Sequence, residues 1–259
     1  MKILFIGDII AKAGRRLTSR LLPEVVEKQS IDFIIANGEN SAGGNGITPK
    51  VARELFSLGV DVITTGNHVW DKKEVLEIMG QEPYLLRPAN YPPRVPGKGY
   101  CIKETFPGET RVAVLNISGR VFMPPLDCPF QVIDKCLKEM KADVVIVDFH
   151  AEATSEKMAM GWYLDGRVSA VIGTHTHVQT ADERVLHGGT AYITDAGMTG
   201  PLDSIIGVEK EPALNRFLLG MPAKFHPARE DLIFCGVIIE VNEKTGKAAG
   251  ISRLQIPAP

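Results

Sequence analysis

The chain has 259 residues, 44% of them hydrophobic, and its 29 Lys and Arg residues nearly balance 31 Asp and Glu residues, for a net charge of −2. This length is sufficient to bury a large core, and the balanced charge excludes a global basic field for binding long nucleic acid. No apolar run reaches the roughly 18 residues that a membrane span requires, so we expect no membrane partner.

The N-terminus and the cysteines both favour a cytoplasmic protein. A short strand follows the first residues directly, without the longer apolar stretch of a secretory signal. The four cysteines form no CxxC pair and no regular framework, which is typical of a reduced compartment. They are Cys101, Cys128, Cys136 and Cys235.

The first 80 residues repeat one pattern three times, in which an apolar strand ends in polar residues and a helix follows. The predicted strands cover residues 3–7, 33–38 and 62–66, and the predicted helices cover 16–29, a segment from 49 onward, and 71–79. Thr48 is expected to cap the second helix and Asp71 the third, while Pro23 is expected to divide the first. This alternation predicts right-handed crossovers and a parallel sheet.

The rest of the chain adds antiparallel signals. Predicted strands cover 99–106, 112–117, 144–149, 168–172, 190–194, 232–241 and 249–256, and predicted helices cover 130–140 and 155–164. Hairpin turns are expected at Pro107-Gly108-Glu109-Thr110 and at residues 242–246, and a loop at 195–201. We therefore predict an α/β fold with two packed sheets, forming one mixed domain over residues 1–259.

Five of the predicted strands are followed by side chains that bind metals. Asp8, Glu39-Asn40, Asn67-His68 and His150 come at the ends of four strands, and His175 and His177 follow Gly173 after the fifth. Ligands bind at the carboxyl edge of open α/β sheets, so these side chains are expected to share one crevice. The alternative for His175 and His177 is a pair of polar loop histidines that cap local carbonyls.

This set of ligands favours two metal ions. It contains no thiolate, and mixed nitrogen and oxygen ligands suit iron, manganese or zinc. Because there are more candidates than one tetrahedral ion can use, we expect two ions bridged by Glu39. Two ions roughly 3.5–4 Å apart can activate a water and clamp a phosphoryl group during displacement. His68 would then protonate the leaving group, unless it is a loop histidine that orients Asn67.

These segments resemble, in the same order, the motifs of calcineurin-like metallophosphoesterases, and more closely those of the bacterial YmdB-type branch. The resemblance is carried by residues 6–9, 36–44, 65–71, 148–157, 173–177 and 194–201, and it extends over nearly the whole chain. It implies a two-sheet sandwich flanked by helices, a di-iron or mixed-metal centre, and hydrolysis of small phosphodiesters, with 2′,3′-cyclic nucleotides as the substrate class.

The resemblance also implies a role for each site residue. One metal would take Asp8, Glu39 and His177, and the other would take Glu39, Asn67, His150 and His175, with His68 as proton donor. The chain departs from the broader family in having Ile10 where the first motif has a histidine. Asn40 is expected to replace that ligand through its side-chain oxygen. Glu39 stands in place of the usual bridging aspartate.

Other functions are compatible with parts of this pattern. The same chemistry could act on a phosphomonoester, a phosphoprotein or an RNA end, and the fold could serve as a non-catalytic nucleotide or RNA sensor. An amidohydrolase is rejected, because its HxH normally follows the first barrel strand. A homo-oligomer is compatible with these features.

Several other residues near the motifs are expected to have supporting or structural roles. Glu152, Thr154 and Glu156 are expected to cap the helix that follows His150, with support of the site as the alternative. Residues 194–201 are a candidate substrate-lining loop. His187 and His226 are expected to be structural.

Overall fold

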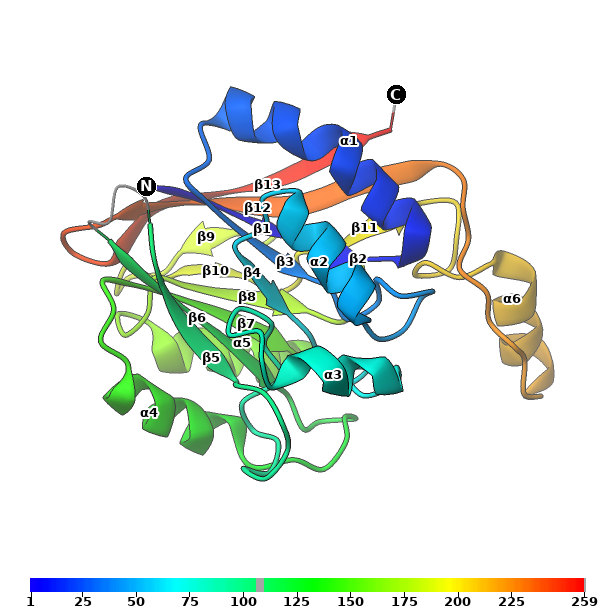
Figure 1. Ribbon diagram of the computed structural model, residues 1–259, viewed down its shortest axis with the longest axis horizontal. Helices are drawn as coiled ribbons and strands as arrows, with labels where there is room; N and C mark the ends of the chain where they lie inside the picture. The colour runs from blue at the N-terminus through cyan, green and yellow to red at the C-terminus, as the bar shows by residue number, and fades with distance from the viewer. Residues whose placement is uncertain (106–109, 259) are drawn as a thin grey trace.

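Two β-sheets pack face to face with helices on both outer sides (Figure 1). The structure is a computed structural model that describes residues 1–105 and 110–258. Helices α1 (Ala11–Gln29) and α2 (Pro49–Ser57) cover one sheet, and α4 (Pro129–Glu139) and α5 (Thr154–Leu164) cover the other. The predicted two-sheet sandwich is therefore confirmed.

The first sheet has seven strands. Their order is β2 (Asp8–Ile9), β11 (Met198–Pro201), β12 (Leu232–Asn242), β1 (Lys2–Ile6), β3 (Phe33–Asn37) and β4 (Val62–Thr64), with β13 (Lys247–Pro257) paired to β12. Strands β1, β3 and β4 are parallel to one another, whereas β12 runs antiparallel to both β1 and β13.

The second sheet has six strands. Their order is β5 (Tyr100–Glu104), β6 (Arg111–Ser118), β7 (Val144–His150), β8 (Ala170–Thr174), β10 (Ala191–Ile193) and β9 (Arg184–Val185). The four central strands are parallel and both edges are antiparallel. The remaining elements are η1 (Lys73–Val75), α3 (Leu76–Met79) and α6 (Lys210–Leu219), and α6 projects from one end of the molecule (Figure 1).

The apolar side chains of β1 show how alternation divides the core. Ile3 and Phe5 pack between the sheets with residues of β6, β7 and β8. Leu4 and Ile6 point to the opposite face and pack under α1 and α2. Because successive side chains of a strand face opposite sides, one apolar run fills two layers of the core. This explains why the strands read as continuous apolar segments.

Helix α1 differs from its prediction at both its start and its middle. It begins at Ala11 rather than Arg16, and Pro23 lies within it without dividing it. The first turn has small or polar residues, so apolar periodicity does not reveal it. Its start is held by tertiary bonds, in which the Ala11 amide donates to the Asn40 carbonyl and the Ile10 amide to the Thr199 carbonyl, both at 2.9 Å.

The two predicted helix caps have opposite outcomes. Thr48 caps α2 as predicted, accepting a bond from the Val51 amide with Pro49 at the first position. The prediction for Asp71 is wrong, because Lys72 precedes η1 and no side chain caps that short helix. Asp71 instead bonds to the side chains of His68 and Asn45.

The strands of both predicted hairpins pair as expected, whereas part of the predicted loop is a strand. Strands β5 and β6 pair antiparallel, as do β12 and β13, although the turn residues 107–109 lie outside the described residues. A loop is predicted at 195–201, but 198–201 form β11, which pairs with β2 and β12. Glycine and proline favour a turn locally, and the pairing with remote strands overrides them.

Two further predictions concern cysteines and membranes. All four cysteines are free, with Cys101 and Cys235 buried. Among the helices of the described residues, none is long and apolar enough to cross a membrane.

Candidate metal centre

All seven predicted metal ligands lie together where strands of both sheets end. Parallel strands place their carboxyl ends at one edge, and a buried carboxylate joins the two sheets there. Asp148 at the end of β7 accepts bonds from Asn37 of β3 and Thr64 of β4. The ligands that this arrangement brings together are Asp8, Glu39, Asn40, Asn67, His150, His175 and His177.

The acidic and imidazole ligands form two groups that share one residue. Asp8, Glu39 and His177 form the first group, and Glu39, His150 and His175 form the second. In each group the ligand atoms lie within 4.8 Å of one another. Glu39 belongs to both groups, which is the arrangement that a bridging carboxylate requires.

The second group crowds several ligand atoms around one imidazole nitrogen. His150 Nε2 lies 3.0 Å from Glu39 Oε1, 3.0 Å from Asn67 Oδ1 and 3.0 Å from His175 Nδ1. A single N–H can satisfy only one of these neighbours well. A cation at the centre of these four atoms could accept a lone pair from each of them, so the donor set fits a metal ion.

Glycine at position 66 leaves room for this group. A Cβ there would lie 2.3 Å from Glu39 Oε2 and 2.3 Å from His150 Nε2. Any side chain would therefore enter the space among the ligands. The cradle thus depends on Gly66, and this also supports the fit of a metal to the site.

The charges of the buried ligands depend on one another. Burial raises the pKa of Asp8. Burial also opposes ionisation of Glu39 and His150, but their mutual attraction lowers the pKa of Glu39 to about 2 and raises that of His150 to about 9. Burial and the neighbouring His150 lower the pKa of His175 to about 3, so His175 is neutral and offers a lone pair.

Asn40 lies beside the first group, with its amide nitrogen toward the ligands. Its Nδ2 is 3.3 Å from Asp8 Oδ1, 3.2 Å from Glu39 Oε1 and 3.1 Å from His177 Nε2. Half a turn of the amide would present its oxygen to the same place. Ile10 is buried in an apolar contact with Met198, so its side chain lines the site and supplies no ligand atom.

His68 borders the cavity over the ligands. This cavity has a volume of about 380 Å³ and is also lined by Asn40, His177 and Phe225. The His68 side chain is 39% exposed, and its Nδ1 lies 2.9 Å from Asp71 Oδ2. That bond occupies Nδ1 and orients the ring, which leaves Nε2 available to a molecule in the cavity.

Asp148 supports the site, and its role was not predicted. It is fully buried and accepts a bond from Thr174 Oγ1 at 2.7 Å, and the same hydroxyl lies 2.9 Å from His150 Nδ1. This chain of bonds orients the His150 ring. Burial raises the pKa of Asp148 to about 6, with His150 opposing the rise. Its spacing of two residues from His150 on one strand is a signal that could have revealed it.

A buried ion pair supports the turn that carries the two later histidines. Asp195 Oδ2 lies 2.6 Å from Lys157 Nζ and accepts bonds from the amide and hydroxyl of Thr176 at 3.0 and 2.7 Å. His175 and His177 have backbone φ angles of +98° and +67°. Such conformations persist only when the surroundings hold them, and Asp195 provides that hold. No local spacing indicates this role.

The predicted capping residues after His150 have other partners. Helix α5 begins after Ala153 and has no side-chain cap bond, so the predicted cap is wrong, although Glu156 lies in the first turn as expected. Glu152 Oε2 lies 3.1 Å from His175 Nε2, and Glu156 accepts bonds from the Arg120 and Val121 amides. His187 and His226, which were expected to have structural roles, are exposed and belong to neither ligand group.

The fold and this site together define a metallophosphoesterase. The sequence model of a family described as YmdB-like protein matches residues 4–254, and the chain belongs to this family. The resemblance inferred from the motifs is confirmed.

Individual relatives agree with this assignment. The chain is 48% identical to a 2′,3′-cyclic-nucleotide 2′-phosphodiesterase of Bacillus subtilis, over 99% of this chain and 97% of the relative. Among solved structures, a hypothetical protein from Thermus thermophilus is 46% identical, with a TM-score of 0.94 and 100% coverage of both chains. A phosphatase from Mycoplasma pneumoniae is 35% identical, with a TM-score of 0.94 over 99% of this chain and 93% of that one.

Proposed function

We propose that the protein is a metal-dependent phosphodiesterase that hydrolyses 2′,3′-cyclic nucleotides and opens the ring at the 2′ oxygen. The observation that carries this is the pair of ligand groups sharing Glu39 beneath a cavity bordered by His68. The name of the Bacillus subtilis relative supports the substrate class.

In this proposal the ligands would hold two ions. Asp8, Glu39, Asn40 and His177 would hold one, and Glu39, Asn67, His150 and His175 would hold the other. The mixed nitrogen and oxygen donors suit iron, manganese or zinc, and the resemblance to YmdB-type proteins favours iron among them. When bound, such ions act as Lewis acids that activate water and neutralise phosphoryl charge.

The chain's own residues then complete the hydrolysis. As a water oxygen bonds to phosphorus, the bond from phosphorus to the 2′ oxygen breaks. His68 Nε2 delivers a proton to that leaving oxygen, and Asp71 holds the ring in place through Nδ1. Asp148 and Asp195 keep the ligands oriented through Thr174 and Thr176. The product is a 3′-phosphate with a free 2′-hydroxyl.

The test is an assay of three esters with one metal analysis. The protein is purified without chelator and given 2′,3′-cyclic AMP, 3′,5′-cyclic AMP and a simple phosphomonoester, with manganese or iron added. We expect turnover of the 2′,3′ ester, about two metals per chain, and loss of both metals and activity to a chelator. Preference for the monoester would favour a phosphatase, and two metals without any turnover would favour a sensor. The cytoplasmic location and single-domain organisation stay predictions.

A further inference from the structure

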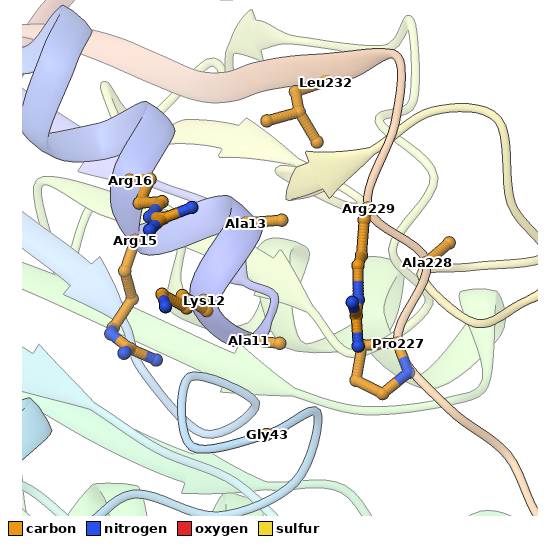
Figure 2. Close-up of a pocket in the computed structure, with 10 residues that line it drawn as sticks. All are labelled: Ala11, Lys12, Ala13, Arg15, Arg16, Gly43, Pro227, Ala228, Arg229 and Leu232. Atoms are coloured by element: carbon orange, nitrogen blue, oxygen red, sulfur yellow. The ribbon is translucent and has the colours of Figure 1, made fainter.

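A second cavity lies between the start of α1 and the segment that leads into β12. It has a volume of about 580 Å³. Figure 2 shows Lys12, Arg15 and Arg16 on α1 at one side of it and Arg229 at the other, with Gly43 in the loop below. The first three residues belong to one helical turn, whereas Arg229 lies far along the chain. The fold therefore assembles four cations around one hollow.

These cations are largely unneutralised. Among the described residues, no acidic side chain lines the cavity. Arg15 pairs with Glu54 at 3.1 Å, but within residues 1–105 and 110–258 no carboxylate forms an ion pair with Lys12, Arg16 or Arg229. The first turn of α1 contains no acidic residue, so the helix dipole adds to the positive potential. Such a concave cluster of one sign attracts an anion.

This second cavity, called the basic cavity below, adjoins the cavity bordered by His68, called the metal cavity. Gly43 and Pro227 line both. In the wall between them, Ile10 borders the metal cavity and the next residue, Ala11, borders the basic one. At Gly43 this wall carries no side chain, and an added Cβ would meet no atom within 4 Å. Two cavities that share a border suit a flexible ligand with two anionic groups, one held in each cavity.

We propose that the basic cavity binds a second phosphate of the substrate, which is a short RNA ending in a 2′,3′-cyclic phosphate. This inference rests on the proposed function. The cyclic phosphate occupies the metal centre, and the phosphodiester on the 5′ side of the terminal nucleotide lies among the cations. A cyclic mononucleotide has a single phosphate and leaves the basic cavity unused.

The chemistry of the cavity matches this ligand. Guanidinium groups bind phosphate oxygens through paired N–H donors, and two of the cations, Arg16 and Arg229, are arginines with no ion pair to a described carboxylate. A 2′,3′-cyclic phosphate forms at the end of a ribose chain, so the next phosphate lies one nucleotide away. The net charge of −2 does not oppose this, because only one or two phosphates need a local positive site.

The test compares two substrates in matched variants. The substrates are 2′,3′-cyclic AMP and the dinucleotide ApA with a terminal 2′,3′-cyclic phosphate. The variants are Arg16→Gln and Arg229→Gln, and Lys28→Gln is the control, because Lys28 lies on the same helix outside the cavity and pairs with Glu24. The native protein should prefer the dinucleotide in kcat/KM by roughly tenfold, the size expected of a charge-assisted contact.

Each arginine variant should reduce this preference toward one, and Lys28→Gln should retain it. The dependence of the dinucleotide's kcat/KM on salt should become shallower in the arginine variants, because salt screens attraction to exposed charges. The thermal midpoints should stay near that of the native protein, since all three side chains are exposed.

The outcomes separate this inference from the proposed function. Turnover of cyclic AMP with no preference for the dinucleotide overturns the inference and leaves the proposed function standing. If neither ester is hydrolysed, the proposed function fails, and binding of a fluorescent ApApA 3′-phosphate is measured by anisotropy. Binding that weakens in the arginine variants alone supports the cavity as a phosphate site. Binding that all variants share, or that inorganic phosphate matches in affinity, overturns it.

Discussion

The cavity over the metal centre and the basic cavity share Gly43 and Pro227, but the two regions differ in how their charges are held. In the metal centre, Asp8, Glu39 and His150 are fully buried, and each contacts another ligand. In the basic cavity, the cations are mostly exposed. Buried charges depend on their partners, whereas exposed ones are screened by water and salt. A single substitution should therefore have a large effect in the first region and a modest one in the second.

The largest effect should come from Glu39→Gln. The variant removes the carboxylate that both ligand groups share. Changes to residues that only support metal ligands cost about 10- to 100-fold, so loss of this ligand should reduce kcat/KM by more than that. Metal analysis should show clearly fewer than two ions per chain. The exposed carboxylate of Glu24 provides the control, and Glu24→Gln should retain both metals and turnover. Full metal content in Glu39→Gln would contradict the shared-ligand assignment.

His68→Ala should separate catalysis from metal binding. Loss of a general acid lowers kcat by about 10²- to 10⁴-fold, while the metal content should remain that of the native protein. A substrate with a nitrophenolate leaving group needs no proton, so its turnover should fall much less. Asp71→Asn should show a weaker form of the same pattern, because Asp71 acts through His68. An unchanged kcat for 2′,3′-cyclic AMP in His68→Ala would show that His68 is not the proton donor.

Two ion pairs of equal length contrast a buried carboxylate that has further hydrogen bonds with an exposed carboxylate. Asp195–Lys157 and Asp203–Lys210 both have N–O distances of 2.6 Å, but the first pair is buried and the second is exposed. Asp195→Asn leaves a buried ammonium unpaired and should lower the free energy of unfolding by about 3–5 kcal/mol. Asp203→Asn should change it by less than about 1 kcal/mol. Urea denaturation measures both, and equal losses would remove burial as the cause.

The smallest effect should be a pH dependence at Asp182, a carboxylate of intermediate exposure. Burial raises its pKa, but bonds from Thr180 and Thr194 outweigh burial and lower it. A carboxyl group whose pKa is lower in the folded protein stabilises it above the unfolded value near 3.9 and loses that contribution as pH falls. The native protein should therefore exceed Asp182→Asn in stability at pH 7, and the difference should shrink below about pH 4. A difference that grows on acidification would reverse the assigned sign.

Much of the site could be predicted because its signal is local. A polar residue directly after an apolar strand must lie at the sheet edge, and parallel strands bring those edges together. This pattern predicts Asp8, Glu39 and His150 in one crevice, where the structure has them. The spacing of Asp148 and His150 is equally local, but Asp148 was not among the predicted site residues.

Other features could not be read from neighbouring residues. Asp71 resembles a helix cap, yet it bonds to His68 and Asn45. Residues 198–201 carry glycine and proline, which favour a turn, yet they pair with β2 and β12. In both cases a contact with another segment outweighs a weak local preference.

Local sequence patterns predict most of the strands and helices, the ligand types at the strand ends and the family resemblance. Which side chains meet depends on packing between distant segments, as for Asp195 with Thr176 and Arg229 opposite Lys12. The physical reason is that hydrophobic periodicity sets which face of an element is buried. Pairing between distant segments depends instead on the register of the strands and the packing of the layers. The net charge of −2 is a sum over the whole chain, so it does not reveal a local basic cavity that this packing creates.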